Sequence, residues 1–199
     1  MLIPEAEKWR LFVALEVPEK VREGLAAIQW ELQARGLGHL RWVRPEGVHI
    51  TLKFLGETPA GRVEEIGRAL APVAVASPPL ALRLGRLGTF GDRKGPRVLW
   101  VSLEGDVERL SLLQRRVEDA LASLRFEREA RPFSPHITLA RVPLTVVGSS
   151  AGNVRAAVAA VKVPPLEMRI DQVSLMRSHL GPGGARYEQV MAFPLEGMR

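Results

Sequence analysis

Two histidine–threonine pairs are the residues of this sequence whose types and spacing can support catalysis. His49 and Thr51 stand two positions apart, and so do His136 and Thr138. Because side chains alternate between the two faces of a β-strand, residues i and i+2 point to the same side. Each segment is therefore predicted to present one imidazole beside one hydroxyl, with its isoleucine and leucine turned toward a core.

The two pairs lie in a longer internal repeat. Residues 44–52 and residues 131–139 share Arg, Pro, His, Ile, Thr and Leu in the same register. A single His-x-Thr segment on a strand is better explained as a structural histidine. A repeat that extends through Arg and Pro instead indicates duplication, so two related lobes that contribute one histidine each are expected.

A pair of histidines suits attack on a phosphodiester. Imidazole titrates near neutrality, so two histidines can supply a neutral base and a protonated acid at the same pH. The base would deprotonate water, and the acid would protonate the departing sugar oxygen. The hydroxyls of Thr51 and Thr138 can donate to nonbridging phosphate oxygens, where negative charge develops in the transition state.

The sequence does not indicate a metal site or a nucleotide cofactor, and neither is expected. There is no cysteine, and neither motif has a carboxylate or second histidine at the spacing of zinc ligands. His39 and His179 have no counterpart in the repeat and are not expected to be catalytic. A Walker-type Gly-Lys-Ser/Thr loop is also lacking.

The predicted elements alternate along the chain. Strands are predicted over residues 9–17, 41–43, 48–55, 80–87, 97–103, 136–141, 166–176 and 187–193. Helices are predicted over residues 18–36, 60–71, 107–124 and about 150–160, with Pro72 ending the second. Residues 91–96 and 178–184 are predicted as a turn and a loop. No low-complexity linker separates the halves, so one α+β domain over residues 1–199 with two intertwined lobes is expected.

Amino-acid composition narrows the possible partners and location of the protein but does not identify its function. The chain of 199 residues carries a net charge of +6, and Arg outnumbers Lys. This balance favours a polyanionic partner, although it also fits a heat-adapted protein. No apolar run approaches the roughly 20 residues that span a bilayer, and residues 1–10 lack the layout of a secretory signal. A cytoplasmic location without a membrane partner is expected.

The quoted motifs resemble those of the two-histidine (2H) phosphoesterase superfamily, and most closely the RNA 2′,3′-cyclic phosphodiesterases, LigT-like proteins once called 2′-5′ RNA ligases. The segments that carry the resemblance are residues 10–14, 48–56, 96–100, 135–141 and the strand of Tyr187. The resemblance implies a bilobal, pseudo-two-fold duplicated fold in which two antiparallel β-sheets face a central cleft, with helices packed outside.

The resemblance also implies an activity and roles for the motif residues. RNA 2′,3′-cyclic phosphodiester ends would be hydrolysed to 2′-phosphomonoesters, with His49 as proton donor to the 3′-oxygen and His136 as proton acceptor from water. Similar proteins also join RNA ends through 2′-5′ linkages, which is the reverse type of reaction. The expected partner is RNA with a 2′,3′-cyclic phosphate end, such as tRNA halves or oligoribonucleotides, bound by a monomer.

Four further residues are predicted to bind substrate: Arg141, Arg131, Phe54 and Tyr187. Arg141 follows His136 by five positions, which places it nominally on the opposite strand face, so contact with the phosphate requires a twist or turn of the chain. Phe54 and Tyr187 can stack on a base, as aromatic side chains do in proteins that bind single-stranded RNA. The alternatives are a solvated arginine and two core aromatics.

Two other functions remain open from the sequence. The same chemistry could act on a small cyclic nucleotide, an ADP-ribose cyclic phosphate or a 2′-5′ oligonucleotide. A module that binds RNA ends without turnover is the non-enzymatic alternative. The presence of both histidines and both threonines argues against that second alternative.

Overall fold

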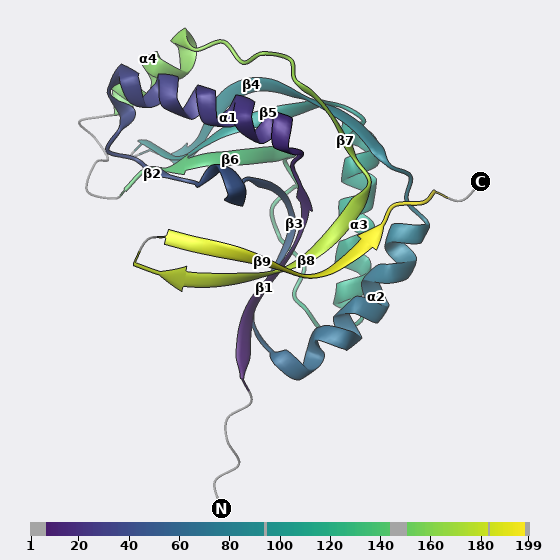
Figure 1. Cartoon of the computed structure of the whole chain (residues 1–199). Coiled ribbons are helices and arrows are strands. Elements are labelled where there is room, and N and C mark those ends of the chain that lie inside the picture. The colour runs from purple at the N-terminus through teal and green to yellow at the C-terminus, as the bar shows by residue number, and fades with distance from the viewer. Residues whose placement is uncertain (1–6, 94, 144–150, 183, 198–199) are drawn as a thin grey trace, which may run out of the picture.

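The computed structural model describes residues 7–93, 95–143, 151–182 and 184–197 (Figure 1). In these residues the strands form two antiparallel sheets with helices outside them, so the predicted α+β class is confirmed. The first sheet has the strand order β3-β1-β8-β9, and the second has the order β2-β6-β5-β4-β7.

The bounds of the elements follow from the backbone. The first sheet contains β1 (Lys8–Glu16), β3 (His49–Pro59), β8 (Gln172–Gly181) and β9 (Gly184–Pro194). The second contains β2 (Arg41–Trp42), β4 (Leu80–Asp92), β5 (Gly95–Gly105), β6 (His136–Arg141) and β7 (Glu167–Ile170). The helices are α1 (Glu19–Leu32), α2 (Val63–Val75), α3 (Val107–Ala122) and α4 (Ala151–Ala160), with short irregular turns over Gln33–Leu37, Pro45–Gly47 and Ala60–Arg62.

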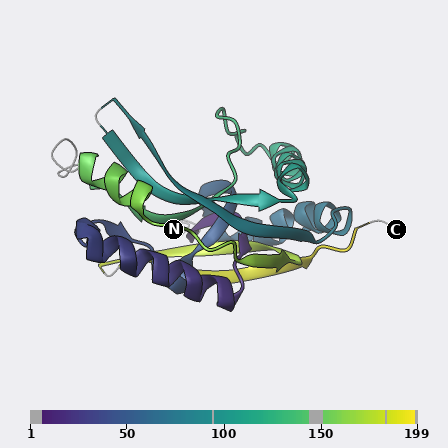
Figure 2. The same ribbon diagram turned by 90° about the horizontal axis from the view of Figure 1, so that it is seen from above.

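The two sheets are layered, and the helices lie in two groups. Figure 2 shows the yellow strands of the first sheet below the teal strands of the second, with α1 and α4 at one end and α2 and α3 at the other. Helices α2 and α3 pack against each other, and α4 packs on β4 and β5. None of the helices within the described ranges is long and apolar enough to cross a lipid bilayer.

The duplication is visible in the topology. In the first half, α1 and the short strand β2 lie between β1 and β3, and β1 and β3 pair in the first sheet. In the second half, α3 connects β5 to β6, and these two strands pair in the second sheet. Each motif strand therefore pairs with the strand that precedes its helix, which gives the two motifs equivalent strand partners.

Both motif strands carry a β-bulge directly after the threonine. In β3, Thr51 and Lys53 pair with consecutive residues of β1, so Leu52 is the extra residue. The same irregularity between β5 and β6 makes Leu139 the extra residue. The first six residues of both strands share one burial pattern: half-buried, buried, half-buried, buried, buried, exposed. A bulge shifts the alternation by one position, so the sixth side chain returns to the face of the histidine.

Direct hydrogen bonds join the two halves near the motifs. Strand β2 precedes the first motif in the chain but pairs with β6, where Trp42 lies opposite Ala140. The amide of Val43 donates to the carbonyl oxygen of Leu139 at 2.8 Å. The buried side-chain amide of Gln29, from α1, donates to the carbonyl oxygens of Val43 and Leu139 at 2.8 and 3.1 Å. Since Leu139 is the bulge residue, these bonds fix the bulge of the second motif to the first half.

Four predicted segments have wrong boundaries: the second helix, the turn over residues 91–96 and two segments near the C-terminus. The second helix continues through Pro72 to Val75, because a proline in the last turn removes only one backbone hydrogen bond and the following amides bond to the carbonyl oxygens of Pro72 and Ala74. The predicted turn over residues 91–96 is mostly strand, since Asp92 pairs with Gly95; Lys94, within that turn, lies outside the described residues.

Two predicted segments near the C-terminus also differ from the observed strands. The predicted strand over residues 166–176 is two strands, because the chain leaves the second sheet after Ile170 and enters the first at Gln172. Most of the predicted loop over residues 178–184 continues β8, with Ser178 opposite Tyr187. Gly183 in that loop, and Ser150 at the start of the predicted fourth helix, lie outside the described residues.

Candidate active site

His49 is the first residue of β3, in the first sheet, and is partly buried. Its Nδ1 lies 2.7 Å from the carbonyl oxygen of Gly47. A carbonyl oxygen can only accept, so Nδ1 carries the proton in this hydrogen bond. The bond fixes the ring orientation and leaves Nε2 as the nitrogen that can exchange a proton with a substrate.

His136 is the first residue of β6 and has the same local geometry. Its Nδ1 lies 2.6 Å from the carbonyl oxygen of Ser134, again two residues earlier. In each motif the turn before the strand therefore orients the imidazole, and Nε2 is left for chemistry. The duplication extends to the hydrogen bond that sets the tautomer.

The two motif strands contact each other although they belong to different sheets. The charges of His136 and Arg141 act on His49, which places all three side chains within electrostatic reach of one another. Thr51 and Thr138 are partly buried and lie on the same strand faces as their histidines. The structure therefore brings both predicted His-Thr pairs to one region between the sheets.

Aromatic rings pack against both imidazoles. The ring of His49 lies 4.9 Å from that of Phe12 and 5.1 Å from that of Tyr187, which meets it edge-on. The ring of His136 lies 4.9 Å from that of Phe90, also edge-on, and 6.3 Å from that of Trp100. Sequence patterns did not indicate Phe12, Phe90 or Trp100, because their proximity to the histidines depends on strand pairing.

Burial shifts the protonation of both histidines. Among the influences on His49, burial has the largest effect and lowers the pKa, while the hydrogen bond to Gly47 and the carboxylate of Glu16 raise it. The charges of His136 and Arg141 lower the pKa of His49 further. For His136, burial also lowers the pKa the most; the hydrogen bond to Ser134 opposes the shift and the charge of Arg141 adds to it.

Arg141 and Phe54 each lie five residues after a motif histidine and are exposed. The bulges described above turn both side chains to the face of the histidine, which supplies the turn of the chain that a role for Arg141 requires. The positive charge of Arg141 acts on both imidazoles. Phe54 is 63% exposed, which is unusual for an aromatic side chain and leaves its ring open to a partner.

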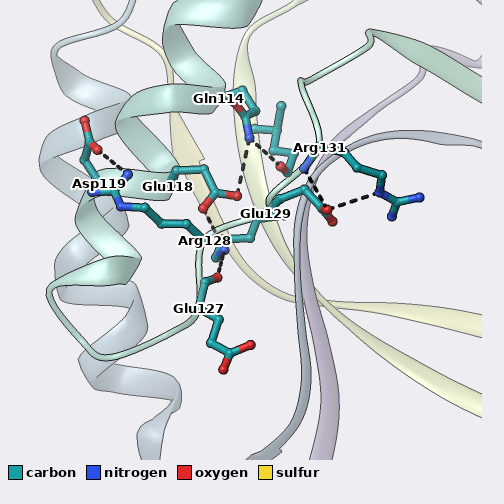
Figure 3. A network of polar contacts seen from close by, with 9 residues as sticks. Gln114, Glu118, Asp119, Glu127, Arg128, Glu129 and Arg131 are labelled. Carbon is teal, nitrogen blue, oxygen red and sulfur yellow. Dashed lines mark hydrogen bonds and ion pairs between the residues drawn. The ribbon is translucent and has the colours of Figure 1, made fainter.

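Arg131 precedes β6 and is exposed to solvent. Its side chain is 87% exposed, and its Nε donates to Oε1 of Glu129 at 3.2 Å (Figure 3). Its predicted role in substrate binding stays a prediction. Nε2 of His179 lies 2.7 Å from Oε2 of Glu188 on the β8–β9 hairpin.

A buried ion pair connects the first motif strand to the segment that leads into the second. Nζ of Lys53 lies 2.8 Å from Oε2 of Glu118, and the two side chains are 3% and 9% exposed. The same ammonium group donates to the carbonyl oxygen of Glu127 at 2.6 Å. In Figure 3, Glu118 and Gln114 project from α3 toward this region, and Gln114 bonds to both Glu118 and the carbonyl oxygen of Leu52.

Sequence reasoning missed this ion pair. Simple alternation would place Lys53 on the same face as the motif histidine, at position i+4, and would turn Phe54 toward the core. The bulge at Leu52 exchanges the two faces. A lysine in an otherwise apolar strand segment is the only hint that the sequence offers.

No group of three or more His, Asp or Glu side chains within the described segments is arranged to hold a metal ion. The geometry instead offers two orientated imidazoles, two hydroxyls and one guanidinium near one another. Such a set can bind a phosphate group and transfer protons on both sides of it.

Comparison with known proteins supports this description. The family described as LigT-like phosphoesterase matches the chain twice, over residues 15–100 and 101–187. Each match contains one His-Thr pair, so the two halves are similar to the same unit.

Two relatives match most of this chain. The RNA 2′,3′-cyclic phosphodiesterase of Geobacillus stearothermophilus is 33% identical over 186 residues, which are 94% of this chain and 57% of that protein. The chain therefore spans little more than half the length of that relative. The protein of the same name from Thermotoga maritima is 30% identical over 188 residues, covering 94% of this chain and 96% of its own.

Solved structures share the fold. A crystal structure of a Thermus thermophilus protein is similar with a TM-score of 0.75 at 30% identity, over 96% of this chain and 100% of that one. Escherichia coli LigT complexed with 3′-AMP gives a TM-score of 0.73 at 26% identity, over 95% of this chain and 99% of that one.

Proposed function

The chain belongs to the LigT-like phosphoesterase family, and on that premise we propose that it hydrolyses RNA 2′,3′-cyclic phosphodiester ends to 2′-phosphomonoesters. The observation that carries the proposal is the pair of equivalent imidazoles, each with Nδ1 bound to a carbonyl oxygen and Nε2 left available. The names of the relatives from G. stearothermophilus and T. maritima support the choice of substrate.

The proposed reaction divides two proton transfers between the motifs. Nε2 of His136 takes a proton from water, whose oxygen attacks phosphorus and forms the new P–O bond. The bond between phosphorus and the 3′-oxygen breaks, and Nε2 of His49 gives its proton to that oxygen. The cyclic ester thus opens to a 2′-phosphate and a free 3′-hydroxyl, and no metal or cofactor enters the balance.

The other predicted residues act on the phosphate and the base. The hydroxyls of Thr51 and Thr138 donate to the nonbridging oxygens, and the guanidinium of Arg141 offsets their charge. Phe54 and Tyr187 contact the terminal nucleotide, with Phe54 supplying an open ring face for stacking.

We also propose how the protein is organised and where it acts. Residues 1–199 act as one domain of two intertwined lobes, supported by the hydrogen bonds of Val43 and Gln29 to Leu139. The chain works as a cytoplasmic monomer on RNA ends such as tRNA halves or oligoribonucleotides. Ligation through a 2′-5′ linkage is the reverse reaction at the same site, with a 5′-hydroxyl in place of water.

A short RNA that ends in a 2′,3′-cyclic phosphate tests the proposal directly. The protein is freed of metal with a chelator, incubated with this RNA, and the product is analysed for the position of its phosphate. We expect a 2′-phosphate in the presence of chelator. Unchanged RNA, a 3′-phosphate, or turnover that returns only with a divalent cation would each contradict the mechanism.

The same assay separates the alternative substrates. A 2′,3′-cyclic mononucleotide, a cyclic phosphate of ADP-ribose and a 2′-5′ oligonucleotide are compared with the RNA by kcat/KM. Higher values for any of these three than for the RNA would contradict the choice of RNA ends. Salt-sensitive binding of the RNA without product would favour a module that only binds RNA ends.

A further inference from the structure

The residues directly opposite the two motif histidines differ in charge. In the first sheet, Glu16 of β1 lies opposite His49. In the second sheet, Ser102 of β5 occupies the equivalent position opposite His136. Residues that face each other in an antiparallel pair project to the same side, with Cβ atoms about 4.5–5.5 Å apart. The duplicated site is therefore symmetric in its histidines and asymmetric in their closest cross-strand neighbours.

Polar side chains from β8 and β9 hold the carboxylate of Glu16 in place. Its Oε2 accepts hydrogen bonds from Gln172 at 3.2 Å, from the hydroxyl of Ser174 at 2.9 Å and from the side-chain amide of Gln189. Gln189 also donates to the hydroxyl of Ser174 at 2.9 Å, and Ser174 is fully buried. Three donors on one oxygen hold the carboxylate in one orientation.

Ser102 is held differently and carries no charge. Its hydroxyl accepts a hydrogen bond from the backbone amide of Arg86 at 2.9 Å. A Cβ at the neighbouring Gly85 would lie 2.4 Å from this hydroxyl, so the position is closely packed. This neighbour leaves the charge state of His136 to the other groups around it.

We infer that Glu16 is a positioning residue that selects His49 as the proton donor, because its carboxylate favours the imidazolium form beside it, whereas Ser102 leaves His136 to act as proton acceptor. The inference rests on the proposed function and deepens it. It assigns a physical cause to the two roles, which the symmetry of the motifs by itself leaves undecided.

Glu16 is the charged group that distinguishes the surroundings of the two rings, since the charges of His136 and Arg141 both lower the pKa of His49. The groups that surround His49 are Glu16 from β1, His136 and Arg141 from β6, and the phenol of Tyr187 from β9. Burial lowers the pKa of His49 most, and Glu16 is the charged group that raises it. For His136, burial again lowers the pKa most, and the charged group that acts on it, Arg141, lowers it further.

The test removes the charge of the Glu16 side chain and keeps its shape. The C2 protons of the histidines are titrated by NMR in the wild-type chain and in Glu16→Gln, and the spectra of His49→Ala and His136→Ala assign the two signals. Glu16→Gln keeps an oxygen that accepts from the same donors and removes the charge. We expect the pKa of His49 to fall by about 0.5–1 pH unit, with that of His136 nearly unchanged. An unchanged pKa of His49 would overturn the inference.

A reciprocal variant keeps the inference testable if Glu16→Gln does not fold. Ser102→Asp introduces a carboxylate opposite His136, and Ser102→Asn is its uncharged control. We expect the pKa of His136 to rise by a similar amount in the aspartate variant only. Equal values in the two variants would show that the cross-strand position does not set the protonation of the histidine.

The activity of Glu16→Gln separates this inference from the proposed function. His49 must be protonated to act as donor, so a lower pKa of His49 moves the alkaline limb of the kcat/KM profile to lower pH by the same 0.5–1 unit. At pH values above that limb, kcat/KM should therefore fall roughly three- to tenfold relative to the wild-type chain. A uniform loss at all pH values would overturn the inference and leave the proposed function standing. If the wild-type chain does not hydrolyse the cyclic phosphate, the proposed function fails, while the NMR titration still decides whether Glu16 controls His49.

Discussion

Phe54 and Arg141 occupy the same position in the two halves of the molecule: each follows its motif histidine by five residues, and a bulge turns each to the histidine face. The duplicated backbone therefore presents an aromatic ring from one half and a guanidinium from the other. An RNA end consists of a base and a phosphate, and these two side chains match its two parts.

Replacement of Phe54 by Ala is expected to weaken binding without slowing the chemical step. Stacking on an aromatic side chain contributes about 1–3 kcal/mol per base, so KM for the RNA should rise roughly five- to 150-fold while kcat changes little. Steady-state kinetics measure both values. Trp30, which is 76% exposed on α1, provides the control, since Trp30→Ala should alter neither constant. A loss confined to kcat would contradict the stacking role.

Replacement of Arg141 by Gln is expected to lower kcat more than it raises KM. Its charge acts near both imidazoles, where negative charge develops on the phosphate in the transition state. Loss of one such group costs about 10²–10³-fold in kcat. Arg131→Gln is the comparison: its side chain points to solvent and pairs with Glu129, so a much smaller effect is expected. Equal losses in the two variants would contradict a distinct role for Arg141.

Removal of either motif histidine is expected to abolish most of the turnover. General acid or base catalysis contributes about 10²–10⁴-fold, so kcat/KM of His49→Ala and His136→Ala should each fall by at least that range. His39→Ala and His179→Ala are the controls, because neither residue belongs to a motif strand pair. Near-normal turnover in either motif variant would refute the acid–base assignment.

The pH dependence follows from the direction of the two pKa shifts. The acceptor His136 must be neutral, so the rate rises as pH rises through its pKa. The donor His49 must be protonated, so the rate falls as pH rises through its pKa. Burial lowers both values from the ordinary 6.5, and we expect the optimum of kcat/KM below that pH. Since the rings interact, the two limbs are macroscopic values.

Comparison of kcat/KM and kcat profiles provides the check. A bound phosphate places negative charge beside both imidazoles and favours their protonated forms, so the kcat profile should lie at higher pH than that of kcat/KM. An optimum of kcat/KM above about pH 8 would point to groups other than these histidines.

The buried ion pair of Lys53 and Glu118 makes a prediction about stability. Lys53→Met leaves the carboxylate of Glu118 buried without its partner, which should lower the free energy of unfolding by about 3–5 kcal/mol. The double variant Lys53→Met/Glu118→Leu should recover most of this loss. Denaturant unfolding measures both. The exposed pair Arg83–Glu104 is the control, where Arg83→Met should have a small effect. No recovery in the double variant would contradict the explanation.

The sequence was sufficient for the class of fold and for the placement of each histidine beside its threonine. The repeated sequence motifs around His49 and His136 can be recognised locally, and strand alternation correctly placed each threonine on the same face as its histidine. The α+β class and the two antiparallel sheets are confirmed. The roles of individual residues in catalysis stay predictions.

What the sequence did not indicate depends on contacts between distant segments. Periodicity contains no signal for the bulge at Leu52, and without the bulge Lys53 and Phe54 exchange faces. Glu16 reaches its place beside His49 through strand register, and its hydrogen-bond donors lie more than 150 residues further along the chain. The change of sheet at Asp171 was missed because both flanking segments have ordinary strand composition.

The strand order also determines when each half of the site can form. In the second sheet, β4, β5 and β6 are neighbours both in sequence and in space, so the strand of His136 can find its place through local pairing. In the first sheet, β1 lies between β3 and β8, and Leu11 pairs with Arg177. Long-range pairs of this kind form slowly, because a large loop must close first. The strands of His49 and His136 each pair with a strand that lies close in sequence, so we expect both pairs to form early in folding. The first sheet is completed later, because Tyr187 beside His49 and the donors to Glu16 belong to the last strands of the chain to be synthesised.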